Sequence, residues 1–525
     1  MKLLLTTLAI VYLSLFMSLQ AQEQVRVIPY PAEVTMQAET CKLKSGQKIH
    51  YLDASLYKEA AFLEKKLADL NYKMKVIPGK KAAKGINLSL DNRLQNKEGY
   101  QLIIAPKQVL IKGGSPAGVF YGIQTLLQQL TNGDLRCGTI EDAPRYEWRG
   151  YMLDEARHFS GEKRVKQILD LMAYYKMNRF HWHLTDAQGW RIEIKQYPKL
   201  ATIGGEGCHS DPDTPAQYYT QEQIRDIIAY AKERHIEIIP EIDMPGHAEA
   251  ALHSYPELGC FNRPVEIPKL GFTPNIFCAG KENTLQFLKN VLDEICTLFP
   301  SSYIHLGGDE APKGNWDKCP DCQKRIAAMN LKDSHDLQLW FSAQMAEHLK
   351  SKGKKAIFWG DVVYNDGYPL PDNIVIQWWN YRGHKDLALR NALRHHYPVI
   401  CSTNYYTYLN FPLTPWKGYE QARTFDLKDV YMNNPSYKAT QESNPLIRGM
   451  GCALWTDDGV KEYMIDRRLF PRILALAEQM WHNGPLMDFD AFYQRILHKK
   501  KWFENRGYGF GPALTEETDN NYKWE

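Results

Sequence analysis

Two carboxylates stand side by side in the segment YIHLGGDE, where Asp309 and Glu310 follow an apolar run and two glycines. Neighbouring acids repel each other and are costly to bury, so a buried pair needs a reason. Proton transfer is one such reason, because a carboxyl group whose pKa is shifted toward neutrality can donate a proton and later accept one. The pair is therefore a candidate catalytic site.

Aromatic residues recur within or just beyond other short apolar runs of the chain. Any one of them could simply pack in a core. Aromatic faces beside carboxylates nevertheless suit sugar rings, whose C–H faces stack on them, and cleavage of a glycosidic bond needs both a protonated acid and a negative group near the developing positive charge. Acids and aromatics together therefore favour glycoside hydrolysis. The aromatic residues are Trp182, Trp190, Trp359, Trp378, Trp379, Tyr408 and Trp455.

Two other functions fit parts of this pattern. His181 and His183 alternate on a predicted strand and share one face, where they could chelate a metal as in metal amidohydrolases. In those enzymes the histidine pair belongs on the first barrel strand, and the first strand predicted here has none, so hydrogen-bonded core histidines are the simpler interpretation. A non-catalytic glycan-binding protein would also carry aromatics, but it has no need for a titratable acid pair.

The elements that must position these residues follow from the rhythm of the chain after Trp148. Eight short apolar runs alternate with helical stretches such as 221–234, 284–299 and 336–350. This alternation predicts an α/β fold with a (β/α)8 TIM barrel. A doubly wound sheet usually has fewer strands and often a glycine-rich phosphate turn, which follows none of these runs. The predicted strands lie in RGYMLDEAR, RFHWHLTD, EIIPEIDMPGH, YIHLGGDE, KAIFWGD, IVIQWWN, PVICSTN and GCALWTDD.

Nearly every predicted strand ends in polar residues. In a barrel these residues would lie at the C-terminal rim, where active sites are found. A single acid at such a position could merely cap the next helix, but eight strand ends of this kind favour an active site. The residues are Asp154, Arg157, His183, Asp186, Asp243, His247, Asp309, Glu310, Asp361, Asn380, Asn404 and Asp457.

A small α/β unit is predicted before the barrel. It contains a helix over 57–70, two strands in 99–114 that meet at a turn near Pro106, and a helix that begins at Ser115 and Pro116. Turn residues in EDAPRYEWRG mark its end. The predicted division is a small domain over 22–143 and a catalytic barrel over 144–525.

The first residues predict export. Lys2 precedes a long uncharged apolar run that ends near the small residue Ala21, a pattern typical of a cleaved signal peptide over residues 1–21. An uncleaved membrane anchor is the alternative, because the run is close to the length that spans a bilayer. The prediction is a secreted or periplasmic protein with no lipid-attachment cysteine and no membrane span after signal removal.

Charge and cysteine content narrow the partners and cofactors. The net charge is +3 and no run of Lys or Arg stands out, so nucleic-acid binding is not indicated. Cys260 and Cys278 flank a Pro-rich stretch that a disulfide could close. Cys319 and Cys322 form a lone C-x-x-C, for which a local disulfide or two free thiols is favoured over zinc. The oligomeric state stays open.

Four separated motifs, LDEARHF, HWHLTDAQGWRIEI, EIDMPGH and HLGGDE, resemble those of the family 20 glycoside hydrolases, the exo-acting β-N-acetylhexosaminidases. They occur in the family's order, and 99–130 resembles the small domain that precedes the family's barrel. The resemblance implies a glycan substrate and no metal or organic cofactor. It also implies substrate assistance, in which the 2-acetamido carbonyl of the sugar acts as the nucleophile.

This resemblance divides the work of the acid pair. Glu310 matches the general acid/base, and Asp309 matches the residue that orients the acetamido group and stabilises the oxazolinium intermediate. Neighbouring residues on a regular strand point to opposite faces, so the chain must leave strand geometry there. Gly307 and Gly308 could provide this by a close backbone approach or a positive φ. Repulsion within the pair would help keep Glu310 protonated.

The remaining site residues carry over from the family as substrate-binding positions. Arg157 matches an arginine on the hydroxyls of the terminal sugar, Asp186 and His247 match a pair that supports Glu310, and Tyr408 matches a tyrosine bound to the acetamido oxygen. Trp359, Trp379 and Trp455 match aromatics that line the sugar pocket, with the choice between Trp378 and Trp379 left open.

The sequence departs from the family pattern at three places. Ala187 replaces an acid often found after Asp186, Asn410 stands two residues after Tyr408 where an acid is expected, and Asp457 follows Thr456 where the family usually has Glu. Asn410 and Asp457 remain candidate substrate-binding residues. We therefore expect retaining exo-hydrolysis that releases terminal β-linked GlcNAc, with GalNAc as a second sugar. A lacto-N-biosidase that releases a disaccharide is the alternative within the class.

Overall fold

The computed structural model describes residues 25–514, except for 131–132, 209–210, 212, 270, 414–424, 442, 458–459, 461–463 and 506. The predicted signal peptide, residues 1–21, lies outside the described residues. Within the described part of the chain, no helix is both long enough and apolar enough to cross a membrane.

Eight parallel strands close into a barrel in the order β12-β13-β14-β15-β16-β17-β8-β9. Every predicted strand is present, so the predicted TIM barrel is confirmed. The strands are β8 (Trp148–Asp154), β9 (Arg179–His183), β12 (Glu237–Glu241), β13 (Tyr303–His305), β14 (Lys355–Trp359), β15 (Ile374–Trp378), β16 (Val399–Cys401) and β17 (Ile447–Leu454).

The barrel interior changes from apolar to polar toward the C-terminal ends of the strands. Ile239 and Ile357 belong to one buried apolar cluster inside the barrel. Two residues further along the same strands, Glu241 and Trp359 meet through a hydrogen bond from the indole Nε1, 2.8 Å long. Residues two apart on a strand point to the same face, so each of these strands places one side chain in the apolar layer of the interior and the next inward one in the polar layer. The polar layer forms the floor of the rim.

Helices surround the barrel, and the three predicted from periodicity are confirmed to within two residues at α6, α8 and α11. A capping box of Thr220 and Gln223 begins α6, whose Ile224, Ile227 and Ala231 are buried. The full set is α4 (Gly161–Tyr174), α5 (Lys199–Thr202), α6 (Gln221–Lys232), α7 (Glu249–Ser254), η2 (Pro256–Leu258), α8 (Glu282–Leu298), α9 (Gly314–Lys318), α10 (Pro320–Ala328), α11 (Ser334–Ser351), η3 (Gly360–Val363), α12 (Tyr381–His384), α13 (Leu387–Arg394), α14 (Asn404–Thr407), α15 (Leu427–Asn433), α16 (Pro435–Thr440), α17 (Ile465–Leu469), α18 (Arg472–Trp481) and α19 (Phe489–Glu504), with a small hairpin of β10 (Thr185–Asp186) and β11 (Gly189–Trp190).

A mixed seven-stranded sheet precedes the barrel, in the order β1-β7-β5-β6-β4-β2-β3. The predicted hairpin and both predicted helices are present as β5–β6, α2 and α3. Pro116 occupies the first turn of α3, where its missing N–H costs nothing. The elements are β1 (Glu33–Lys42), β2 (Lys48–Tyr51), η1 (Ala54–Leu56), α2 (Tyr57–Asp69), β3 (Lys75–Pro78), β4 (Gly85–Leu90), β5 (Tyr100–Ala105), β6 (Gln108–Gly113), α3 (Pro116–Gln129) and β7 (Asp134–Asp142).

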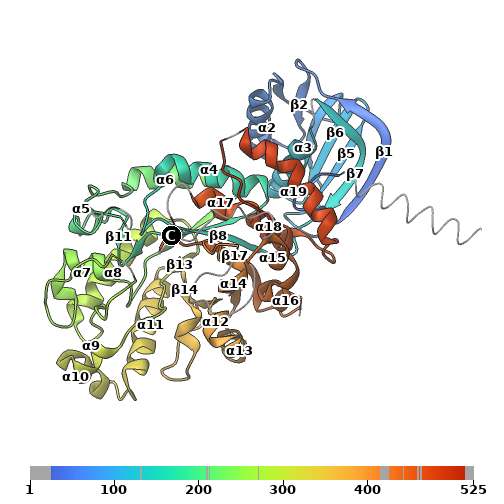
Figure 1. The fold of residues 1–525 in the computed structure, drawn as a ribbon. Helices are drawn as coiled ribbons and strands as arrows, with labels where there is room; N and C mark the ends of the chain where they lie inside the picture. Colours follow the sequence, from blue (N-terminus) through green and yellow to red (C-terminus); the bar gives the residue numbers. More distant parts are fainter. Residues whose placement is uncertain are drawn as a thin grey trace, which may run out of the picture.

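A buried ion pair joins this sheet to the barrel. Asp142, at the end of β7, accepts from Lys176 Nζ at 3.1 Å, and both side chains are inaccessible to solvent. Tyr100 and Trp481 also donate to Asp142, each at 2.8 Å, which satisfies the buried charge. The C-terminal helix α19 lies beside the small sheet (Figure 1), and Arg495 on it donates to the carbonyl of Val27. The contacts of Asp142 and the contact of Arg495 with Val27 thus hold the small N-terminal unit against the barrel.

The predicted disulfide between Cys260 and Cys278 is wrong, because both thiols are free. The physical reason is that Cys260 and Cys278 are not an isolated pair: Cys319 and Cys322 lie against them. Neighbouring sulfur atoms of this group lie 3.6 to 3.9 Å apart, far longer than the ~2.05 Å of a disulfide bond. The lone C-x-x-C is therefore one half of a four-cysteine cluster.

Candidate active site

The backbone that carries the acid pair leaves strand geometry at once. Strand β13 ends at His305, and positive φ angles follow at Gly307 (63°), Gly308 (91°) and Glu310 (46°). A Cβ on Gly307 would lie 1.7 Å from Asp243 Oδ1, so both a positive φ and a close approach require glycine there. The predicted departure from strand alternation is confirmed.

Both carboxylates of the pair face the same imidazole nitrogen. His247 Nε2 lies 3.6 Å from Asp309 Oδ2 and 3.8 Å from Glu310 Oε2. His247 follows β12 and has a φ of 50°, so a turn in the neighbouring rim loop brings it to the pair. The two acids therefore lie on one side of the chain and around one centre, as two roles on a single sugar would require.

The two acids differ in exposure. The Asp309 side chain is 12% exposed and that of Glu310 is 44% exposed. Burial raises the pKa of Asp309 well above its ordinary value; Asp243 adds to this rise and His247 opposes it. Burial also raises the pKa of Glu310, again against the opposing effect of His247. Glu310 is thus the accessible carboxyl of the pair and stays protonated to higher pH than a free glutamate.

Asp361, in η3 directly after β14, supports the pair from the other side. Its Oδ1 accepts from the backbone N–H of Glu310 at 3.3 Å, and its Oδ2 accepts from Trp379 Nε1 at 2.6 Å. Asp361 stood among the predicted polar strand ends but not among the candidate site residues. Its position after the β14 apolar run was the available signal, and only the fold shows which neighbours it connects.

Asp186 and Arg157 form the second charged group of the rim. Asp186 contacts Arg157 Nη2 at 2.8 Å, His183 Nε2 at 2.8 Å and His247 Nδ1 at 3.1 Å. Burial alone would raise the pKa of Asp186, but the charges of Arg157 and His247 outweigh it and hold the pKa far below its usual range. Arg157 also pairs with Asp154 at 3.1 Å. A chain of contacts therefore runs from Arg157 through Asp186 and His247 to the acid pair.

Because of these contacts with Asp186 and Asp309, the free energy of unfolding should depend on whether His247 is charged. Burial would lower the pKa of His247, but Asp186 and Asp309 outweigh it and raise the pKa to about 9. Since the unfolded value is about 6.5, the stabilisation is complete below that pH and is lost as the pH rises through 9. A shift of this size corresponds to about 3 kcal/mol. Urea unfolding should show that His247→Gln costs about 3 kcal/mol more at pH 5.5 than at pH 10.

His335 provides the matched control for this experiment, because its side chain is exposed on α11. His335→Gln should change the free energy of unfolding little, and equally at both pH values. A cost of His247→Gln that did not vary with pH would contradict a charged imidazole in the folded protein.

Glu241 is a further buried carboxylate that the candidate set omitted. It contacts four side chains: His181 Nε2 at 2.8 Å, His183 Nδ1 at 2.5 Å, His305 Nδ1 at 3.0 Å and Trp359 Nε1 at 2.8 Å. The H-x-H pair therefore consists of hydrogen-bonded interior histidines. The sequence did hold a signal for this position. Glu241 stands two residues before Asp243 in EIIPEIDMPGH, and residues two apart on a strand point to the same face.

The aromatic candidates divide into rim and packing residues. Trp379 stacks on Tyr408 with ring centroids 6.2 Å apart, and Tyr408 lies 6.0 Å from Trp455, which in turn lies 5.8 Å from Trp359. Trp378 instead donates to the Lys385 carbonyl. Of the two neighbours that the sequence left open, Trp379 contacts the rim aromatics, and this favours Trp379 as the candidate pocket residue.

Trp182 and Trp190 lie away from this cluster. Trp182 packs edge-on against Tyr219 at 4.7 Å, and Trp190 donates to the carbonyl of Ile192. Both are core residues rather than rim residues.

Asn410 and Asp457, the two departures from the expected pattern, each hold a buried oxygen. Within the described residues, Asn410 Oδ1 and Asp457 Oδ1 have no hydrogen-bond partner. Burial raises the pKa of Asp457 to about 7, against the opposing charge of Arg157. Unpaired buried oxygens are uncommon in native proteins, and each calls for a partner such as an ordered water or a ligand.

Both parts of the chain match models of one known protein family. Residues 146–484 match the family model described as "Glycosyl hydrolase family 20, catalytic domain", and residues 24–143 match "Glycosyl hydrolase family 20, domain 2". The chain belongs to glycosyl hydrolase family 20. The resemblance predicted from the four motifs is confirmed, and the rim described above is that of a family 20 barrel.

Solved structures agree with this family 20 assignment. The crystal structure of the β-N-acetylhexosaminidase from Bacteroides fragilis NCTC 9343 superimposes with a TM-score of 0.88 at 54% identity, over 95% of this chain and 99% of that one. The GH20 exo β-N-acetylglucosaminidase from Vibrio harveyi, solved in complex with N-acetylglucosamine, gives 0.82 at 27% identity, over 94% and 79% of the two chains.

A curated family 20 relative is the β-hexosaminidase of Porphyromonas gingivalis, 36% identical over 520 residues. The match covers 94% of this chain but 65% of the relative, so the chain spans about two thirds of that protein's length.

Proposed function

We propose that this family 20 enzyme removes terminal β-linked N-acetylhexosamine from the non-reducing ends of glycans, with retention of configuration and with the substrate's own acetamido group as the nucleophile. The observation that carries the proposal is the unequal acid pair around His247 Nε2, one carboxyl buried and the other exposed. The relatives named as hexosaminidases support the same activity.

In this proposal Glu310 moves the proton. It donates to the leaving glycosidic oxygen and, in the second step, accepts a proton from the attacking water. Its 44% exposure leaves room for an aglycone, and its raised pKa supports the protonated form needed in the first step. The hydrogen bond from its own backbone N–H to Asp361 holds the residue in its left-handed conformation.

Asp309 serves the acetamido group in the same scheme. Its carboxylate accepts from the acetamido N–H, orients the carbonyl toward the anomeric carbon and stabilises the positive oxazolinium ring. Burial raises its pKa before substrate binds, and a positive charge beside it favours the ionised form. Its buried Oδ1 has no hydrogen-bond partner among the described residues and is available for this contact.

The other rim residues recognise the terminal sugar. Trp359, Trp379 and Trp455 offer aromatic faces to the ring, and Tyr408 donates to the acetamido oxygen. Arg157, Asn410 and Asp457 bind the outer hydroxyls of the sugar. The last two residues depart from the family pattern at positions that bear on recognition of the sugar rather than on bond breaking. We propose GlcNAc as the principal sugar, in line with the relative solved with N-acetylglucosamine, and GalNAc as a second one. We also propose export through the signal peptide, and a domain division at residues 143/144.

A release assay tests the proposal directly. The full chain should hydrolyse an aryl β-N-acetylglucosaminide and, more slowly, the galacto-configured analogue. The matched β-glucoside, with a hydroxyl in place of the acetamido group, should be turned over at least 10³-fold more slowly, because the nucleophile is missing. Equal turnover of the two gluco substrates would overturn substrate assistance. Release of an intact disaccharide from a glycan terminus, without free GlcNAc, would favour the lacto-N-biosidase alternative.

A further inference from the structure

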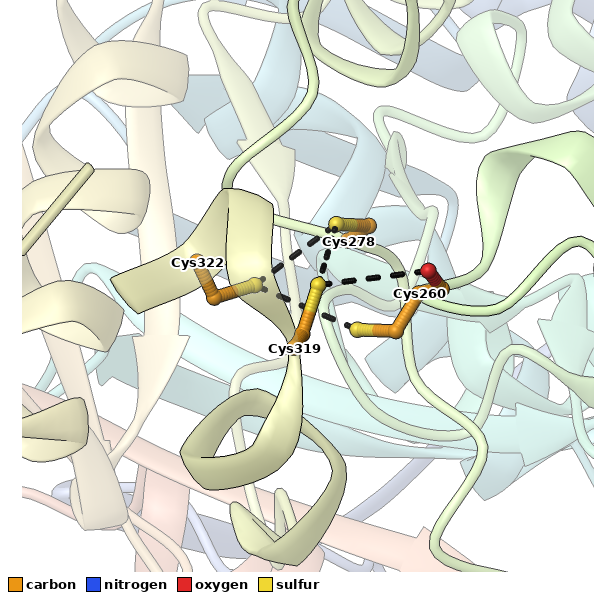
Figure 2. A group of neighbouring side chains, drawn as sticks. All are labelled: Cys260, Cys278, Cys319 and Cys322. Carbon is orange, nitrogen blue, oxygen red and sulfur yellow. Dashed lines mark hydrogen bonds between the residues drawn. The ribbon is translucent and has the colours of Figure 1, made fainter. Parts of the chain in front are cut away.

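Four cysteines from two different rim loops meet at one point (Figure 2). Cys260 and Cys278 lie in the loop between β12 and α8, and Cys319 and Cys322 lie at the start of α10, after β13. Cys278, Cys319 and Cys322 are fully buried, and Cys260 is partly buried. The family 20 mechanism proposed above uses none of them.

The sulfur positions fit a tetrahedron. Cys278 Sγ lies 3.6 Å from Cys322 Sγ and 3.8 Å from Cys319 Sγ, and Cys260 Sγ lies 3.9 Å from Cys322 Sγ. All four sulfurs lie within 4.8 Å of one another. Four thiolates at ~2.3 Å from one central Zn²⁺ would be about 3.8 Å apart along each edge. The measured separations match that edge.

The same distances do not select disulfide partners. Cys278 is nearly equidistant from Cys319 and Cys322, and Cys322 also has Cys260 as a neighbour. Two disulfides would require pairs near 2 Å with the two pairs set apart. A cluster in which one sulfur contacts two others is instead the arrangement expected of thiolates around one central metal ion.

The backbone is built to bring the two loops this close. An isolated antiparallel bridge joins Gly259 to Phe277, and the N–H of Cys278 donates to the Leu258 carbonyl at 2.9 Å. A Cβ on Gly280 would lie 2.3 Å from the backbone nitrogen of Cys322, so this position requires glycine. These contacts hold the first cysteine pair against the start of α10.

Two features of the surroundings place positive charge near the cluster. Cys319 is the N-cap of α10 and Cys322 lies in its first turn, where the positive end of the helix dipole stabilises negative charge. Lys281 is fixed nearby through a hydrogen bond to the Gly259 carbonyl and places a positive charge next to the cluster.

We propose that Cys260, Cys278, Cys319 and Cys322 bind one Zn²⁺ in a closed, structural tetrathiolate site. Four thiols release four protons, four Zn–S bonds form, and no residue is oxidised or reduced. All four ligands come from the protein, which leaves no open position for a water or substrate. The predicted absence of any metal would then be incorrect, although the catalytic centre itself needs none.

Such a site would tie together the two loops that carry the acid centre. His247 belongs to the loop that supplies Cys260 and Cys278, and the segment after β13 supplies both the acid pair and the second cysteine pair. Between them, Trp316 Nε1 donates to the Phe277 carbonyl at 2.9 Å. The ion would act as a clamp that fixes the distance between His247 and the two acids.

Metal analysis of the purified full-length protein, prepared without added metal, tests the proposal. We expect one zinc per chain by mass spectrometry of the elements, and X-ray absorption at the zinc edge should show four sulfur neighbours at ~2.3 Å. Iron in place of zinc would overturn the choice of ion. Four free thiols without metal, or two disulfides in a non-reducing peptide map, would overturn the site itself.

Two variants separate this site from other cysteines. Cys322→Ser should lose the bound zinc, whereas Cys296→Ser, on the neighbouring α8 but outside the cluster, should keep one zinc per chain. Retention of a full equivalent by Cys322→Ser would contradict the assigned ligands. If Cys322→Ser fails to fold, the wild-type metal content and sulfur count still decide the question. None of these readouts depends on glycosidase activity.

Discussion

Glu310→Gln is expected to lower kcat by about 10³-fold, because it removes the group that donates and then accepts the proton while keeping the size of the side chain. The loss of kcat/KM should depend on the leaving group. A substrate with an alkyl or sugar aglycone needs the proton and should lose about 10³-fold, whereas an activated aryl aglycone leaves without one and should lose much less. Steady-state kinetics over a series of aryl glycosides measures this slope.

The pH dependence gives an independent sign of the same role. In the wild type, kcat/KM for a poor leaving group should fall as the pH rises through the raised pKa of Glu310, because only the protonated carboxyl is competent. This limb should be absent in Glu310→Gln. Glu266, an exposed residue of a neighbouring rim loop, serves as the control, and Glu266→Gln should keep wild-type kinetics. A Glu310→Gln variant with a uniform loss for all leaving groups would contradict the assignment.

Asp309→Asn is expected to lower both kcat and kcat/KM by about 10²- to 10³-fold, because a neutral amide cannot stabilise the positive oxazolinium ring. Unlike the effect at Glu310, this loss should be similar for activated and poor leaving groups, since every N-acetyl substrate passes through the same intermediate. The kinetics of the same aryl series on both variants therefore distinguish the two roles.

The substrate itself provides the sharper test of Asp309. On the matched glycoside that carries a hydroxyl instead of the acetamido group, wild type and Asp309→Asn should differ little, because the group that Asp309 orients is missing. The exposed residue Asp213 offers a control, and Asp213→Asn should behave as wild type on both substrates. An equally large loss on the hydroxyl substrate would show that Asp309 acts on something other than the acetamido group.

Different roles for Asp309 and Glu310 are supported by how their carboxylates are placed. Asp309 and Glu310 are neighbours in sequence, yet their carboxylates approach one imidazole nitrogen at 3.6 and 3.8 Å. On a regular strand they would face opposite sides of the sheet. The left-handed conformations at Gly307, Gly308 and Glu310 remove that constraint, and the cost of such a conformation at Glu310 is typical of functional positions.

The repeat of short apolar runs and helical stretches predicted the barrel, all eight strands and the bounds of α6, α8 and α11, because these features depend on local side-chain periodicity. The same periodicity placed Asp186, His247 and the acid pair at strand ends. It could not choose between Trp378 and Trp379, because one residue of difference at a strand end decides which way the ring points. In the structure Trp379 donates to Asp361 at the rim, which favours Trp379.

The sequence by itself determined the fold class, the family and the rim on which the candidate site lies, since each follows from local patterns and motifs that recur in order along the chain. Only the tertiary structure decided which rim residues meet: Glu241 with three histidines, Asp361 with Glu310, and four cysteines from two loops around one point. The physical reason is that periodicity fixes the face of an element, whereas convergence depends on how loops between elements turn and pack. Cys260 and Cys278 were close enough in sequence to predict a disulfide, and it was the approach of α10 that made them half of a larger site.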